Sequence, residues 1–117
     1  MGLRLGSWKT VTIAKDADPA VSDETDLGEN FRNVQVYGPA IDSATITVKP
    51  SRLTGDTAVQ AYTLVVGGAD YVNTTTARAT AGMNLFRDIC ARYVTLLLGA
   101  VQTTAARTFY IRGVDPL

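Results

Sequence analysis

The side chains with the clearest potential for chemistry are carboxylates gathered in one stretch near the start of the chain. They are Asp16, Asp18, Asp23, Glu24, Asp26 and Glu29. Oxygen ligands of this kind suit Ca²⁺, but their spacing fits no EF-hand register. Pro19 and Gly28 punctuate the stretch, which favours turns. We therefore expect one long solvated loop over positions 16–30 and no metal site.

The other groups needed for catalysis or metal binding are missing from the sequence. It contains no His and one cysteine, Cys90. Without His there is no Ser-His-Asp or Cys-His catalysis and no His-based zinc site, and one cysteine forms neither a thiolate cluster nor an intrachain disulfide. The run Gly67-Gly68-Ala69-Asp70 is typical of a turn, not of a phosphate loop. We predict no catalytic residue, no metal ligand, no cofactor and no enzymatic activity.

Length and charge narrow the class of protein further. Residues 1–117 suit one domain with its own core, and we expect residues 1–7 to form a flexible N-terminal arm. Lys plus Arg and Asp plus Glu balance at 11 each, so no net field attracts nucleic acid or an anionic membrane. No segment approaches membrane-spanning length, and the N-terminus lacks the apolar run of a signal peptide. We expect a soluble protein made in a reducing cytoplasm.

The elements that must position any functional side chain are β-strands. Apolar and polar residues alternate with the period of a strand, which predicts strands at 8–14, 31–37, 43–49, 59–66, 89–98 and 107–112. In the first three, alternation groups on one side Val11 and Ile13, then Val34 and Val36, then Ala44, Ile46 and Val48; in the second strand Phe31 and Tyr37 lie on the other side. With shorter strands added, about seven or eight are expected, which is typical of an all-β antiparallel sandwich or jelly roll.

Two stretches between the expected strands have a less decisive pattern. Positions 83–88 are too short for an independent helix, and we expect Leu85 and Phe86 to plug one end of the sandwich. Positions 73–82 are rich in Thr and Ala, a composition equally compatible with an edge strand, an exposed loop or a projecting segment.

The last two expected strands, 89–98 and 107–112, are predicted to pair, with Cys90 as a small buried side chain of the first. The first strand is apolar on both sides: Val94, Leu96 and Leu98 form one, and Tyr93 and Leu97 form the other. A loop of the same chain or a neighbouring subunit must cover the second side. We predict self-association, with a subunit interface formed by Trp8, Tyr93 and Leu97.

The order of these pieces resembles the small virion accessory proteins of tailed bacteriophages, such as capsid cement or decoration proteins. The resemblance rests on Asp26-Leu27-Gly28, Phe31-Arg32-Asn33-Val34-Gln35-Val36-Tyr37, Ser43-Ala44-Thr45-Ile46-Thr47-Val48, Ala91-Arg92-Tyr93-Val94-Thr95-Leu96 and Arg107-Thr108-Phe109-Tyr110-Ile111-Arg112-Gly113. It implies an all-β protein that binds the major capsid protein on the outside of the head, commonly as a trimer, and stabilises the capsid. Its location would be the virion surface after synthesis in the host cytoplasm.

The residues that contact the capsid are predicted on loops, which can offer hydrogen-bonding groups without disturbing strand alternation. They are Asp23, Glu24, Asn73, Thr74 and Thr75. Two alternatives stay open, because fold does not decide function. One is a tail, neck or head-completion component of a phage. The other is a discoidin-like carbohydrate-binding module, for which Tyr71 beside Asp70 is the best placed loop aromatic.

Overall fold

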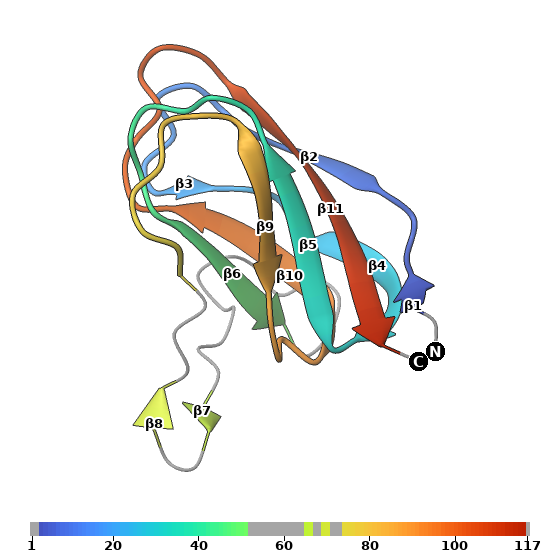
Figure 1. Ribbon diagram of the computed structural model, residues 1–117. Coiled ribbons are helices and arrows are strands. Elements are labelled where there is room, and N and C mark those ends of the chain that lie inside the picture. Colours follow the sequence, from blue (N-terminus) through green and yellow to red (C-terminus); the bar gives the residue numbers. More distant parts are fainter. Residues whose placement is uncertain (1–2, 52–64, 67–68, 71–73, 117) are drawn as a thin grey trace.

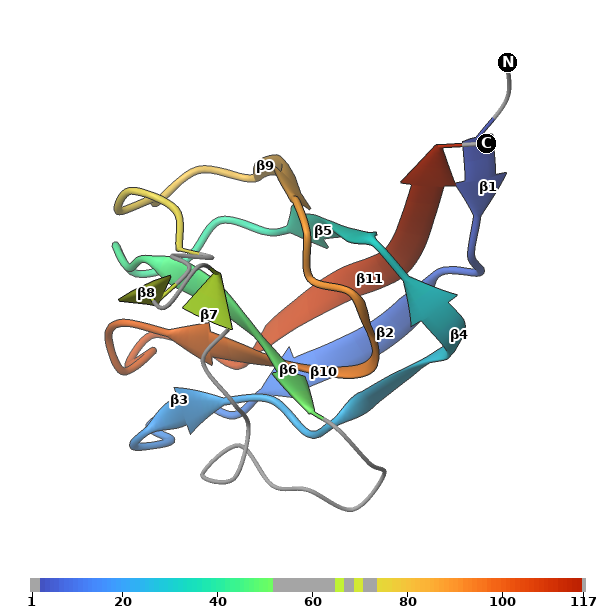
Figure 2. The ribbon, with the colours of Figure 1, turned by 90° about the horizontal axis from the view of Figure 1, so that it is seen from below.

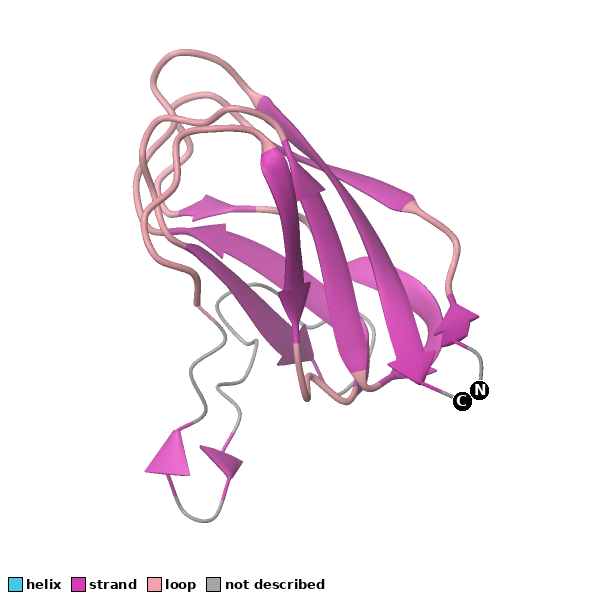
Figure 3. Cartoon of the chain, viewed as in Figure 1, coloured by secondary structure: helices cyan, strands magenta, loops and turns pink. Residues whose placement is uncertain are grey.

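The fold is a sandwich of two antiparallel β-sheets, shown by a computed structural model that describes residues 3–51, 65–66, 69–70 and 74–116. Within these residues the chain forms strands and loops and no helix (Figure 3). Figure 1 views one sheet from outside with the other behind it, and Figure 2 separates β9 and β5 from β3 and β10 in the second layer. The predicted all-β sandwich is confirmed.

The described residues form eleven strands, several of only two or three residues. They are β1 (Leu3–Leu5), β2 (Lys9–Ile13), β3 (Ala20–Val21), β4 (Thr25–Phe31), β5 (Asn33–Gly38), β6 (Ile46–Ser51), β7 (Val65–Val66), β8 (Ala69–Asp70), β9 (Gly82–Phe86), β10 (Ala91–Leu98) and β11 (Arg107–Pro116).

The five-stranded sheet is built around β11, whose ten residues span its whole length. Both β2 and β1 pair with one edge of β11, one after the other, while β5 pairs with the opposite edge. β9 lies on the far side of β5 and is the outermost described strand. The chain ends are therefore neighbours, because Leu3 pairs with Pro116 (Figure 1).

The four-stranded sheet is built around β10. One edge of β10 pairs with β3 and β4, and the other pairs with β6. Beyond β6, Thr74 and Arg78 form isolated bridges with Thr47 and Ala44. Over 74–78, the stretch left open by the sequence therefore extends this sheet at its edge. β7 and β8 pair only with each other and form a separate hairpin.

The core lies between the two sheets and follows the predicted alternation. The side chains that alternation groups together in the first three expected strands are all buried, and they are joined by Phe109 and Ile111 of β11 and by Val94, Leu96 and Leu98 of β10. The sheets approach closely at Gly113, where an added Cβ would overlap the ring of Phe31. Close packing at this point thus requires glycine.

The predicted pairing of the last two strands is wrong. β10 and β11 belong to different sheets, and the connection between them crosses from one layer to the other. Both edges of β10 are taken by β3, β4 and β6, and both edges of β11 by β1, β2 and β5. Since neither strand has a free edge, short separation in sequence does not lead to a hairpin here.

Part of the predicted acidic loop is also wrong, because Asp26 and Glu29 lie on strand β4. The expected strand at 31–37 is in fact two strands: Phe31 ends β4 and Asn33 begins β5, in opposite sheets. The bend at Arg32 separates them. Phe31 and Val34, three residues apart, are both buried, so the alternation changes phase at this bend.

Two predictions near β9 need correction. The stretch expected to plug the sandwich is instead β9, in which Phe86 is buried and Leu85 is 47% exposed. Cys90 precedes β10 and is exposed, with a φ of 55° that turns its side chain away from the core. With a left-handed backbone there, β10 begins at Ala91, two residues later than expected.

Two further predictions concern chain segments that are described only in part. Of the strand expected at 59–66, only Val65 and Val66 fall within the described residues, as β7. Of the segment 1–7, β1 pairs with β11 and the Gly6 N–H donates to the Gly113 carbonyl at 2.8 Å. Residues 3–6 are thereby held against the sandwich.

Candidate binding face

All large apolar side chains that are exposed in the described residues lie on the outward side of the five-stranded sheet. They are Leu3, Leu5, Trp8, Tyr37, Met83, Leu85 and Tyr110. Strand alternation places them there, because their neighbours along each strand point into the core. We call this set the outer apolar face.

Strand register arranges the centre of the outer apolar face in two rows. Met83, Tyr37 and Tyr110 are direct cross-strand neighbours on β9, β5 and β11. The Tyr37 and Tyr110 rings have centroids 6.1 Å apart and are tilted by 52°. In the next row, Leu85 is opposite Gln35, which is opposite Arg112. Residues paired directly across strands share one side of a sheet, so these side chains form one continuous surface.

Arg112 holds a fixed position in the second row. Its guanidinium carbon lies 4.3 Å from the centroid of the Trp8 ring, and its Nε donates to the Gln35 side-chain oxygen at 2.7 Å. The alternation of the five strands makes Arg112 the lone charged side chain on their outward side. The face thus combines aromatic rings, aliphatic side chains and one oriented cation.

The outward side of the four-stranded sheet has a different character. Thr95 and Ser51 lie on that side and are 1% and 4% exposed, so the chain itself covers this part of the sheet. Tyr93 and Leu97 beside them are half-buried. Arg92 packs over the Tyr93 ring at 5.3 Å and pairs with Asp26 at 2.8 Å. No comparable open apolar surface is found on the described part of this sheet.

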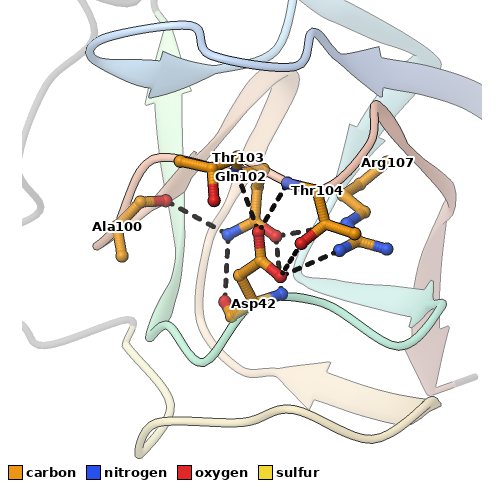
Figure 4. Close-up of polar contacts among 6 residues, drawn as sticks. All are labelled: Asp42, Ala100, Gln102, Thr103, Thr104 and Arg107. Atoms are coloured by element: carbon orange, nitrogen blue, oxygen red, sulfur yellow. Dashed lines mark hydrogen bonds and ion pairs between the residues drawn. The ribbon is translucent and has the colours of Figure 1, made fainter.

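A dense polar cluster at the loop end of the sandwich is the arrangement most like an active site (Figure 4). The Asp42 carboxylate accepts hydrogen bonds from the backbone N–H groups of Thr103 and Thr104, from the Thr104 hydroxyl and from Arg107. The fully buried Gln102 side chain accepts from the Asp42 N–H and donates to the carbonyls of Asp42 and Ala100. These contacts join the β5–β6 and β10–β11 connections.

The hydrogen bonds of this cluster give it a structural role. The Thr104 hydroxyl, followed by the backbone N–H groups of Thr104 and Thr103 and by Arg107, holds the pKa of the Asp42 carboxyl below its usual value, although burial opposes them. The carboxylate is therefore charged and its acceptor positions are occupied. Gln102 also accepts from Arg107 Nε at 3.2 Å. With no group poised to exchange a proton, the cluster fastens loops together.

The acidic residues near the start of the chain are dispersed by the fold. Asp26 pairs with Arg92, and Glu29 pairs with Arg4 at 2.6 Å. A hydrogen bond from Arg92, then one from the Gly28 N–H, lowers the pKa of Asp26 from 3.8 to about 2. Over the residues that the structure describes, no three acidic or cysteine side chains gather as metal ligands.

An open pocket of about 250 Å³ lies between the β1–β2 connection and β4, lined in part by Ser7, Lys9, Leu27 and Glu29. Glu29 is already paired with Arg4. Lys9 is the one other charged side chain in the lining. A single charged group does not indicate which class of ligand the pocket would bind.

The structure does not bring together the three predicted subunit-interface residues. Trp8 lies on the outer apolar face, whereas Tyr93 and Leu97 lie on the outward side of the other sheet. A single flat interface therefore cannot contain all three. Their role in self-association stays a prediction.

The predicted capsid-contact residues flank opposite edges of the four-stranded sheet. Asp23 and Glu24 connect β3 to β4, while Thr74 and Thr75 lie beyond β6; Asn73 falls outside the described residues. Thr74 and Thr47 share a hydrogen bond at 2.8 Å between their hydroxyls, and the Thr75 hydroxyl accepts from the Ile46 N–H. Thr74 and Thr75 thus serve to attach their segment to β6.

Sequence reasoning missed the outer apolar face as a unit, although part of the signal was present. Alternation along β5 puts Tyr37 on the side opposite Val34 and Val36, which is the outward side. The alignment of Tyr110 and Met83 with Tyr37 depends on strand pairing, which a single sequence does not show.

No family model, curated protein or solved structure matches the chain. Among the described residues, none forms a helix of the length and apolar character that crossing a membrane requires.

Proposed function

We propose that this protein is a non-enzymatic structural component of a phage virion, of the capsid cement type, and that it attaches through its outer apolar face. The observation that carries the proposal is the gathering of every exposed large apolar side chain of the described residues on one side of one sheet. Monomeric soluble proteins rarely expose a contiguous apolar surface of this kind unless it binds something.

The composition of the face supports a protein partner. Trp, Tyr and Arg are the residues that most often dominate protein–protein binding energy, with less energetic contacts around them that exclude water. Here Tyr37, Tyr110 and Arg112 lie on the two inner strands, between the aliphatic side chains of β9 and β1, and Trp8 contacts Arg112 from the edge. A flat sheet surface with this distribution suits docking on another folded protein.

The choice of a capsid as that partner comes from the resemblance of the sequence to phage cement and decoration proteins. On a capsid lattice, the partner would be the major capsid protein and the location the virion surface. Repeated copies let modest contacts act together, so a face of limited area can still reinforce a head. A tail, neck or head-completion role would use the same face on a different virion protein.

A carbohydrate-binding function is the second candidate, because three aromatic side chains share the face. Sugar rings stack best on open, nearly parallel aromatic surfaces. The 52° tilt between Tyr37 and Tyr110 breaks such a platform, and the Arg112 guanidinium occupies one side of the Trp8 ring. Both features favour a protein partner over a glycan.

The test is binding of purified protein to phage heads that lack it, followed by heating of the decorated heads. We expect wild type to bind and to raise resistance to heat, and a Tyr37→Ser, Tyr110→Ser double variant to lose both effects while folding normally. Lys49→Ser is the control, because it shortens a long side chain on the outward side of the other sheet.

The alternatives give different results in the same experiment. Reversing the charges of Asp23 and Glu24 tests the contact predicted for the β3–β4 connection, and we expect a smaller loss than from the tyrosine changes. Binding to tail fractions and not to heads would support the alternative that the protein is a tail component. Protein that binds neither would refute the virion role.

A further inference from the structure

Three arginines, Arg78, Arg87 and Arg112, have no ion pair among the described residues, and of these Arg112 is the one that stacks on an aromatic ring. Arg4, Arg32, Arg92 and Arg107 all pair with carboxylates of the same chain. The Arg112 side chain is half-buried and oriented. Its stack on Trp8 and its Nε bond to Gln35 fix the plane of the guanidinium.

This orientation leaves the terminal amino groups of Arg112 without a hydrogen-bond partner among the described residues, since Nε is the atom engaged by Gln35. A planar guanidinium with free terminal N–H groups matches the two oxygens of a carboxylate. Because the plane is already fixed by Trp8 and Gln35, less side-chain entropy is lost when a carboxylate arrives.

We propose that the outer apolar face docks on a different protein whose contact surface is apolar around one carboxylate, and that Arg112 receives this carboxylate. The inference rests on the proposed function, since it names the chemistry of the partner surface. The rows that contain Leu85 and Tyr110 would exclude water around the pair on docking, which strengthens a charge-assisted contact.

A second copy of the chain fits this face poorly. If two copies met through this face, their Arg112 cations would lie close together, and neither face would supply a carboxylate. Asp26, Asp42, Asp88, Asp115 and Glu29 are occupied by arginines of their own chain. Asp16, Asp18 and Asp23 lie in the polar connections around β3 and not on an apolar surface. Over the carboxylates named here, charge complementarity therefore favours a different protein.

The experiment that isolates Arg112 uses a defined probe and no virion. The side-chain Nε–Hε resonance of Arg112 is followed by NMR during titration with 3-phenylpropionate, and with 3-phenylpropanamide as the uncharged match. We expect a saturating shift at millimolar carboxylate, no comparable shift with the amide, and loss of the response at Trp8 and Tyr110 in Arg112→Gln. The Nε resonances of Arg32 and Arg92 are internal controls, because both already bind aspartates.

Head binding then tests the partner itself. With heads that bind wild type, Arg112→Gln is expected to raise Kd about tenfold or more, with Arg112→Lys recovering part of the loss. Unchanged head binding by Arg112→Gln, or equal responses to acid and amide, would overturn the inference and leave the proposed function standing. A carboxylate-specific response without head binding would do the opposite: it would support Arg112 as a carboxylate receptor and refute the capsid as its partner.

Discussion

The guanidinium of Arg112 lies over the ring of Trp8, with 4.3 Å between the guanidinium carbon and the ring centroid. Trp8 comes from the connection before β2, and Arg112 from the second half of β11. Their contact joins the N-terminal part of the five-stranded sheet to its central strand on the outward side. It also places a cation and an aromatic ring, two frequent contributors to binding energy, on the same exposed surface.

Replacing Gln102 by Leu should destabilise the fold by roughly 2–4 kcal/mol, because it removes the partners of several buried polar groups while keeping a similar volume. The Asp42 N–H and carbonyl and Arg107 Nε would all lose a hydrogen bond. Urea unfolding measures the change. Thr103→Ala is the control, since Thr103 contributes its backbone N–H to the cluster and is exposed. Equal free energies of unfolding for the two variants would show that the hydrogen bonds of Gln102 do not stabilise the fold.

Stability should fall as the pH is lowered from about 4 toward 2. The folded-state pKa of Asp26 is lowered from 3.8 to about 2, so its ion pair stabilises the fold above 3.8 and is lost as the pH falls through this window. The pKa of Asp42 is lowered as well. Thermal unfolding across this pH range should show a shallower fall for Asp26→Asn than for wild type. Asp23→Asn, which removes no ion pair seen in the structure, should follow wild type; identical curves for all three would contradict this account.

Self-association, for which the resemblance implies a trimer, should use the parts of Tyr93 and Leu97 that stay exposed beside the covered part of the four-stranded sheet, and leave the outer apolar face free. The argument is electrostatic, because a second copy stacked on that face would place two Arg112 side chains together. Light scattering at micromolar concentration should then show an oligomer that Leu97→Asp dissociates and Trp8→Ser does not. A strictly monomeric wild type would remove the predicted interface.

Local pattern predicted the strands and much of the core, because alternation alone decides which side of a strand is buried. Val34 and Val36 or Ile46 and Val48 are identified in this way without knowledge of their partners. The pairing of strands could not be predicted in this way. The neighbours of β10 and β11 are distant in sequence, and nothing local showed that these strands lie in opposite sheets.

The candidate site was harder to predict for the same reason. The outer apolar face exists only after β9, β5, β11 and β2 are aligned, so the cross-strand position of Tyr110 beside Tyr37 is a result of tertiary structure. Gln102 is a second example: a polar residue in a segment without turn formers gave no sign that its side chain would be fully buried. Its burial depends on hydrogen bonds with Asp42, which lies sixty residues earlier in the chain.

Electron cryomicroscopy of heads decorated with the purified protein tests the central claim most directly, because it shows which side of the sandwich contacts the capsid. The account predicts density on the outside of the head in which the five-stranded sheet faces the capsid, with Tyr37, Tyr110 and Arg112 at the contact and a capsid carboxylate beside Arg112. Decorated heads in which that sheet faces solvent, or heads that carry no added density at saturating protein, would contradict it.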